Sequence, residues 1–216
     1  MKKIAVVLAG NGVYDGAEIH EAVLTLLAIQ KAGAKYVVFA PDIEQAHVIN
    51  HLTGEVANEK RNVLVESARI ARGKISNIAY FNAQEFDALV FPGGFGVAKN
   101  LCNFAFEGAN CKVKPDIERV VKEMLALNKP IGALCISPVI LAKIIGNDVN
   151  LTIGNDIETA KAIESFGANH KSAGHGEIVF DPKYKIITTP CYMLDANIQQ
   201  IAEGAENVIN KIMELL

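Results

Sequence analysis

The sequence predicts an α/β fold in which a mostly parallel sheet is covered on both faces by helices, a three-layer α/β/α sandwich. Short apolar runs alternate with stretches of helical periodicity along the whole chain. The apolar runs are continuous and do not alternate with polar residues, which is typical of strands buried on both faces. A strand, sharp turn and helix are also expected around Cys135.

The individual elements follow from these patterns and from the glycine and proline residues that mark their ends. The expected strands cover residues 3–9, 35–40, 76–80, 87–91, 130–134 and 151–153. A late hairpin is expected at 177–180 and 185–189, because Pro182 suits the second position of a type I turn. The expected helices cover residues 16–32, 43–51, 58–72, 116–128, 138–146, 156–167 and 195–214, with Gly33, Gly73 and Gly167 at helix ends.

Length, composition and charge limit the classes of function. The 216 residues, 50% hydrophobic and 21% charged, suit a globular protein with one domain, residues 1–216. A net charge of −3 without a Lys/Arg cluster predicts no nucleic-acid partner and no membrane partner. The apolar stretch that ends at Gly10 is too short for a signal peptide, and four cysteines without C-x-x-C spacing are expected to stay reduced. These features predict a cytoplasmic location.

Cys135 is the strongest candidate for a functional residue. An apolar run precedes it, and Ser137 and Pro138 follow, which can cap a helix and occupy its first turn. This is the thiol version of a nucleophile elbow. Nearby amides and the helix dipole would favour a thiolate, the form that attacks carbonyl carbon. The alternative is a small buried core residue.

Two further segments are expected beside Cys135, because the carboxyl ends of parallel strands share one edge of the sheet. In the segment 10–21, Asp15 and Glu18 form a plausible capping box, and Glu21 is either a general acid/base or a solvated helix residue. In the segment 91–100, Gly93 and Gly94 provide an oxyanion hole, a phosphate cradle or an ordinary tight turn.

The histidines carry weaker indications. His47 and His51 have the i,i+4 spacing of a metal-binding helix, but no glutamate lies beside His47 and no third ligand is evident, so no metal is predicted. His20 could border the pocket, and His170 or His175 could reach over it. The possible pocket residues are therefore Gly93, Asn100, His20 and His170.

Several long motifs resemble a known family. The segments 12–24, 48–55, 61–64, 92–101 and 188–190 are similar to the ElbB-like isoprenoid biosynthesis proteins with an amidotransferase-like domain, within the ThiJ/PfpI superfamily. The resemblance covers essentially the whole chain. It implies a flavodoxin-like fold of the class I glutamine amidotransferase type.

The resemblance also implies a site and an activity. The nucleophile would be Cys135, its hydrogen-bonded carboxyl Glu21, and the oxyanion-hole amides those of Gly94 and Ile136. Members are described as glyoxalases that convert glyoxal to glycolate without glutathione, or as related deglycases. They are usually homodimers, take a small aldehyde and need no cofactor. The residues 151–156 lack the histidine of many superfamily members, which argues against glutaminase or peptidase activity.

Two other functions remain compatible with the sequence. An accessible thiol at position 135 could be oxidised to a sulfinic acid beside Glu21, as in a redox-sensing stress protein linked to isoprenoid biosynthesis. A flavodoxin-like nucleotide binder is the third possibility, but neither G-K-[ST] nor G-x-G-x-x-G follows a predicted strand.

Overall fold

The computed structural model of the protein describes residues 1–216 and is built on one seven-stranded sheet. Its strands are β1 (Lys3–Val7), β2 (Lys35–Ala40), β3 (Ile75–Asn77), β4 (Ala88–Phe91), β5 (Ile131–Leu134), β8 (Val179–Asp181) and β9 (Ile186–Thr189). They lie in the order β3-β2-β1-β4-β5-β9-β8, and only the β8–β9 pair is antiparallel. The α/β class with a mostly parallel sheet is confirmed.

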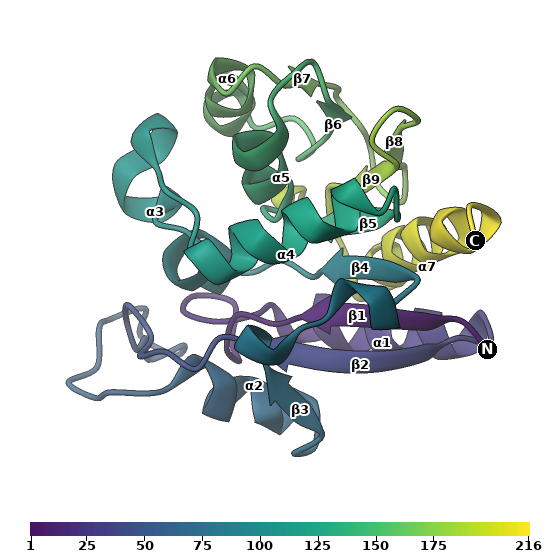
Figure 1. Cartoon of the computed structure of the whole chain (residues 1–216). Helices are drawn as coiled ribbons and strands as arrows, with labels where there is room; N and C mark the ends of the chain where they lie inside the picture. The colour runs from purple at the N-terminus through teal and green to yellow at the C-terminus, as the bar shows by residue number, and fades with distance from the viewer.

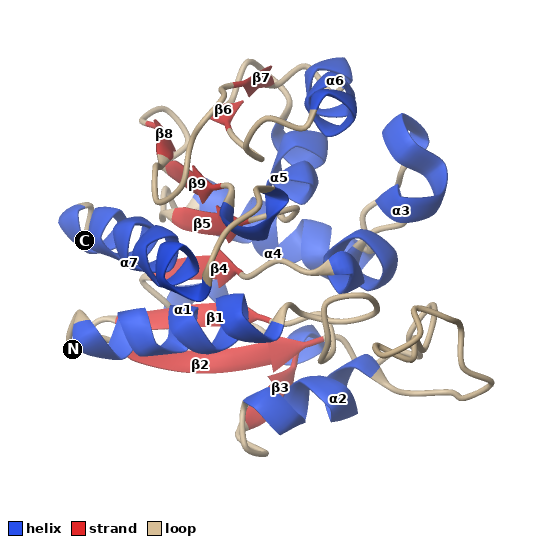
Figure 2. Cartoon of the chain, turned by 180° about the vertical axis from the view of Figure 1, so that it is seen from behind, coloured by secondary structure: helices blue, strands red, loops and turns tan.

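Helices cover both faces of this sheet. The helices of one face are α1 (Ile19–Lys31), α2 (Val63–Ile70) and α7 (Ile198–Glu214), and those of the other are α4 (Pro115–Ala126) and α5 (Pro138–Ile145). Figures 1 and 2 show these two layers from opposite sides, with the two chain termini at one end of the sheet. The short helices α3 (Phe104–Glu107) and α6 (Ile157–Ser165) stand apart from the sheet (Figure 1). No helix has the length and apolarity needed to cross a bilayer.

The alternation of side chains along β1 explains why its sequence is apolar throughout. Ile4 and Val6 pack in a buried cluster with α1 and α7, while Ala5 and Val7 pack in a second cluster with α4 and α5. Successive side chains of a strand point to opposite faces. Burying a Val or Ile side chain stabilises the fold by about 1.5–3 kcal/mol, so both faces of the strand must be apolar.

Three helices begin later in the chain than predicted, because a capping side chain fixes the start of each. Helix α1 begins at Ile19 because Glu18 accepts a hydrogen bond from the Glu21 amide at 2.7 Å. Asn62 caps α2, and Asn197 forms a capping box at the start of α7. The capping box expected from Asp15 and Glu18 is wrong, because Asp15 instead accepts the Ile49 amide at 2.7 Å.

The helix expected at 43–51 is wrong, and the chain there forms an irregular loop that projects from the body (Figure 1). Isolated bridges link Glu44 to Asn62 and Ile49 to Val56. Side chains from other segments satisfy loop amides that a helix would have used internally, as Asp15 does for Ile49. His47 and His51 therefore do not share a helix face, and the spacing that suggested a metal site has no helix behind it.

The strand expected at 151–153 is also corrected. The chain forms β6 (Asn150–Leu151), which pairs in parallel with β7 (Asn169–His170) in a separate two-stranded sheet. The next amide, that of Thr152, donates to the Thr188 hydroxyl at 2.9 Å instead of continuing a ladder. Gly154, with φ of 93°, then turns the chain toward α6.

The loops after β1, β2 and β4 are tied together by one side chain. A π-helical turn, Val97–Leu101, places Asn100 in a buried position. Its amide nitrogen donates to the carbonyls of Ala9 and Asp15, both at 2.9 Å. Its amide oxygen accepts the Ala46 amide at 2.9 Å. Asn100 thus fixes the loops that frame the carboxyl edge of the sheet.

Replacing Asn100 with Ala should lower the free energy of unfolding by about 2–3 kcal/mol, because buried backbone groups lose their hydrogen bonds. The matched control is Asn110→Ala, at an exposed position, which should change it by less than about 0.5 kcal/mol. Urea unfolding measures both. Equal midpoints for the two variants would contradict the anchoring role.

Candidate active site

The structure confirms a strand, a sharp turn and a helix around Cys135. The residue follows β5 directly, with φ of 59° in the left-handed region, and Pro138 opens α5 three residues later. A non-glycine residue in this conformation is strained and is held by its surroundings. Its amide donates to the Thr189 carbonyl at 3.0 Å. Ser137 occupies the N-cap position of α5 as expected, but its side chain does not cap the helix, because its hydroxyl donates to the Pro92 carbonyl at 2.8 Å.

Glu21 is fully buried beside this turn. One carboxyl oxygen accepts the Gly93 amide at 2.8 Å, and the other accepts the Tyr192 amide at 3.3 Å. The carboxyl group is also hydrogen-bonded to the Cys135 thiol. The structure therefore brings Glu21 and Cys135 together, and the alternative of a solvated helix glutamate is wrong.

Gly93 makes this contact possible because it has no side chain. A Cβ atom at this position would lie 2.5 Å from the Cys135 Cβ, 2.6 Å from a Glu21 carboxyl oxygen and 3.0 Å from the Cys135 sulfur. No other residue could let the thiol, the carboxyl group and the Gly93 backbone meet at one point. The glycine pair is therefore part of the site and more than a turn.

Burial controls the protonation of the pair. It raises the pKa of Glu21 to about 8, with a further increase from the charge of Glu18, against the lowering effect of the Gly93 and Tyr192 amides. Burial, and then the charge of Glu21, raise the pKa of Cys135 well above its ordinary value. The amides of Gly94 and Ile136 bond to the sulfur and oppose this effect. A resting thiolate was expected, and that prediction is wrong because burial outweighs the amide contacts.

Cys135 opens into a cavity of about 370 Å³. Most of the wall is apolar, and the polar side chains on it are few. The lining residues are Val13, Glu18, Gly94, Phe95, Ala98, Phe104, Ala105, Cys135, Ile136, Asp156, Thr159, Tyr192 and Met193. The size and the mixture of apolar wall with a few polar groups are those of a small-molecule site. Cys135 is buried like a core residue, but it also forms part of this wall.

Other residues singled out from the sequence lie elsewhere. Asn100 serves the loops described above, and His170 in β7 accepts the Ile153 amide at 3.4 Å; neither lines the cavity. His175 is exposed and lies outside it. His20 reaches the rim, where its Nδ1 is 2.8 Å from the hydroxyl of the cavity residue Tyr192.

Sequence reasoning missed two segments of the wall. Tyr192 and Met193, just after β9, supply a backbone amide to Glu21 and apolar surface to the cavity. Asp156 and Thr159 enter from the start of α6. As a functional segment, the stretch 151–156 was considered only for its missing histidine, but Asp156 at its end is a cavity residue. The rule that strand ends share an edge could have indicated Tyr192, because β9 neighbours β5.

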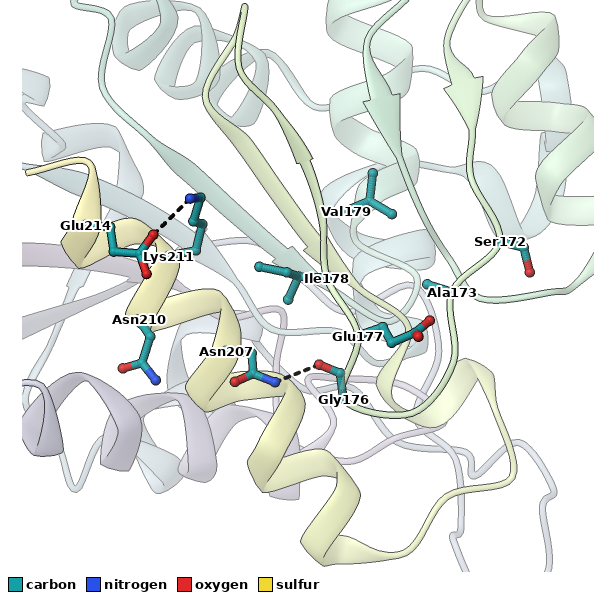
Figure 3. A pocket seen from close by; sticks show the side chains of 10 residues that line it. All are labelled: Ser172, Ala173, Gly176, Glu177, Ile178, Val179, Asn207, Asn210, Lys211 and Glu214. Atoms are coloured by element: carbon teal, nitrogen blue, oxygen red, sulfur yellow. Dashed lines mark hydrogen bonds and ion pairs between the residues drawn. The ribbon is translucent and has the colours of Figure 1, made fainter.

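A second, larger groove of about 770 Å³ lies along α7 and the segment before β8 (Figure 3). The Asn207 side chain donates to the Gly176 carbonyl there at 2.8 Å, and Lys211 pairs with Glu214 on the same helix. The groove is more open and holds no cysteine or histidine. The chemistry of the site therefore belongs to the smaller cavity at Cys135.

This fold is that of a known family. The DJ-1/PfpI family model matches residues 2–152, and the chain belongs to that family. A solved structure from Ehrlichia chaffeensis, described as an isoprenoid biosynthesis protein with amidotransferase-like domain, is similar to this chain with a TM-score of 0.92 and 36% identity. The match covers 99% of this chain and 100% of that one.

Two curated relatives are also similar over nearly the whole chain. The "ES1 protein homolog, mitochondrial" of Rattus norvegicus is 47% identical over 99% of this chain and 84% of its own length. The "Glutamine amidotransferase-like class 1 domain-containing protein 3, mitochondrial" of Homo sapiens is 45% identical over 99% and 83%. Both relatives are named as mitochondrial proteins, which contradicts the predicted cytoplasmic location. The prediction is wrong because the composition of a folded domain does not specify a compartment.

Replacing Gly93 with Ala should drive Glu21 and Cys135 apart, because the new Cβ would overlap both residues. We expect a loss of about 2 kcal/mol in urea unfolding and a fall of about tenfold in the rate of Cys135 alkylation by iodoacetamide. The control is Gly174→Ala, whose Cβ would meet nothing closer than 3.4 Å. Unchanged alkylation in Gly93→Ala would show that this close approach is unnecessary.

Glu21 should make folding stability depend on pH. The folded protein keeps the Glu21 proton up to a pKa of about 8, whereas the unfolded chain releases it near 4.5. Folded molecules therefore bind more protons in this window, so stability falls as pH rises from about 4.5 to 8, by on the order of 4 kcal/mol. Urea unfolding across this range should give a flatter profile for Glu21→Gln. Parallel profiles would refute the buried, protonated carboxyl group.

Proposed function

We propose that the protein is a glutathione-independent glyoxalase that converts glyoxal to glycolate, with Cys135 as nucleophile and Glu21 as general acid/base. We also propose that it belongs with the ElbB-like isoprenoid biosynthesis proteins. The observation that carries the activity is a carboxyl group with a pKa of about 8, hydrogen-bonded to a thiol on the wall of a small cavity. A pKa near the working pH suits a group that must both take up and release a proton.

The first step would be addition of the Cys135 sulfur to one aldehyde carbon of glyoxal. The thiol is protonated at rest, so its proton must leave as the carbon–sulfur bond forms. Ionised Glu21, about a tenth of the molecules at pH 7, accepts it through the existing hydrogen bond. Glu21 then gives this proton to the aldehyde oxygen, so the product is a hemithioacetal and Glu21 is ionised again.

The second step would move hydrogen between the two carbons. Glu21 removes the proton from the sulfur-bearing carbon, which gives an enediolate. A proton shifts from the hydroxyl on that carbon to the neighbouring oxygen, and Glu21 returns its proton to the neighbouring carbon. The result is a thioester of Cys135 that carries a CH₂OH group. Water then cleaves the carbon–sulfur bond, releases glycolate and restores the thiol. The sum is glyoxal plus water to glycolic acid, with no external oxidant.

Developing charge on oxygen would meet backbone amides already in place. The amides of Gly94 and Ile136 bond to the Cys135 sulfur in the resting site. An oxygen on the carbon attached to that sulfur would lie within reach of the same two donors, which is the arrangement of an oxyanion hole. Hydrolysis of the carbonyl adduct of an amine, a deglycase reaction, would use the same residues.

The competing redox-sensing function receives less support. Peroxides oxidise the thiolate, and susceptibility follows thiolate character and exposure. Burial and the Glu21 charge raise the pKa of Cys135, and Cys135 is only 7% exposed. These properties favour a thiol that becomes an anion during attack on a bound substrate over one that meets oxidants in solvent.

Replacing Cys135 with Ala should abolish glycolate formation from glyoxal, and Glu21→Gln should slow it by about 10²–10⁴-fold, because proton transfer is lost. Chromatographic measurement of glycolate from the purified protein tests both. Cys111→Ala is the matched control, a buried cysteine outside the cavity, and should keep wild-type activity. Glycolate formation at the wild-type rate by Cys135→Ala would reject the proposal.

A further inference from the structure

The charges on the wall of the Cys135 cavity all have the same sign. Glu18 and Asp156 line it, and neither lysine, arginine nor histidine does. The rest of the wall is mainly apolar, with Phe95, Phe104 and Met193 among its side chains. A wall of low polarity strengthens the effect of the buried Glu18 charge on a bound molecule, whereas solvent and salt screen the exposed Asp156 more strongly.

Glu18 stands at the start of α1 and is almost fully buried. One carboxyl oxygen accepts the Glu21 amide at 2.7 Å, and the Glu18 amide donates to the Gly93 carbonyl at 2.9 Å. Glu18 is 8% exposed and forms no salt bridge. Its second carboxyl oxygen has no hydrogen-bond partner within the protein and is not closed off from solvent. That oxygen can accept a hydrogen bond from a molecule in the cavity.

Asp156 stands at the start of α6 and, unlike Glu18, is exposed to solvent. Its carboxyl oxygen accepts the Thr159 amide at 2.8 Å. Hydrogen bonds from Thr159 lower the pKa of Asp156, so the group is an anion at neutral pH. Helix N-termini usually attract anions, but those of α1 and α6 are each capped by their own carboxylate.

The cations of adjoining segments are engaged elsewhere. The Lys99 ammonium group donates to the Tyr14 carbonyl at 2.8 Å, and Lys161 of α6 pairs with Glu158 at 3.4 Å. Neither lysine lines the cavity. No cationic side chain on the wall would therefore neutralise a carboxylate or phosphate on an entering molecule.

We propose that Glu18 and Asp156 make the cavity selective for carbonyl compounds that are neutral or carry an amine, and exclude those that carry a carboxylate or phosphate. This inference rests on the proposed function insofar as Cys135 is the residue that the carbonyl compound meets. The same repulsion would help an acid product such as glycolate to leave. Hydroxyl or amine hydrogens of the substrate would donate to the free carboxylate oxygens.

Two alkylating reagents of nearly equal size test the selectivity without any turnover. Iodoacetamide is neutral and iodoacetate is an anion. The rate of Cys135 modification by each is measured by mass spectrometry of the Cys135 peptide and divided by its rate with 2-mercaptoethanol in the same buffer. We expect the normalised rate with iodoacetate to be lower by at least about tenfold at low salt, because two carboxylates repel it.

Charge-neutralising variants assign the effect to these residues. Glu18→Gln and Asp156→Asn should each raise the normalised iodoacetate rate relative to iodoacetamide by about threefold or more. Glu18→Gln also removes a charge that raises the pKa of Glu21, and a more ionised Glu21 would itself repel iodoacetate, so Asp156→Asn is the unconfounded variant of the two. The control is Glu158→Gln, which removes an exposed charge from α6, the helix that Asp156 caps. Glu158 lies outside the cavity wall, so this variant should leave the ratio unchanged.

The outcomes separate this inference from the proposed function. Equal normalised rates in the wild-type protein overturn the charge selection and leave Cys135 as an accessible nucleophile. A ratio that favours iodoacetamide in a protein that makes no glycolate supports the selection and rejects the glyoxalase. Failure of both reagents to modify Cys135 overturns both proposals. The wild-type measurement decides even if a variant does not fold.

Discussion

The hydrogen bond between the buried Glu21 carboxyl group and the Cys135 thiol is the constraint around which the site is arranged. A carboxyl group without solvent contact is costly to ionise, so it keeps its proton to about pH 8. Two backbone amides, from Gly93 and Tyr192, hold it in one orientation. The thiol is correspondingly kept neutral until a proton acceptor is available. The reactivity of Cys135 therefore depends on the protonation state of Glu21.

The parallel sheet supplies this pair from distant parts of the chain. Cys135 stands at the end of β5, Gly93 follows β4, and Tyr192 follows β9, three neighbouring strands of the sheet. Glu21 comes from the first turn of α1, whose start is fixed by Glu18. Glu18 therefore has three effects: it caps the helix, raises the pKa of Glu21 and gives the cavity wall a negative charge.

The absence of a histidine from the cavity changes the chemistry expected of this family fold. An imidazole would supply a base with an ordinary pKa near neutrality. Here a carboxyl group reaches that range through burial, and Asp156 occupies the side of the cavity where the sequence lacks the histidine. Under the proposed function, this carboxyl group moves a proton within a small uncharged substrate. Peptide or glutamine hydrolysis, which uses a histidine base, has no counterpart among the lining residues.

The sequence by itself determined the layered α/β fold, the elbow at Cys135 and the convergence of the segments 10–21 and 91–100 beside it, because these depend on local patterns and on the geometry of parallel sheets. The pairing of Glu21 with Cys135 was implied only by the family resemblance. It did not determine the loop at 43–51, where Asp15 and Asn100 supply partners from distant segments. Only the tertiary structure brought Tyr192 and Asp156 to the cavity. The same holds for the protonation of Cys135, since burial is a property of the whole packed molecule and overrides the local preference for a thiolate.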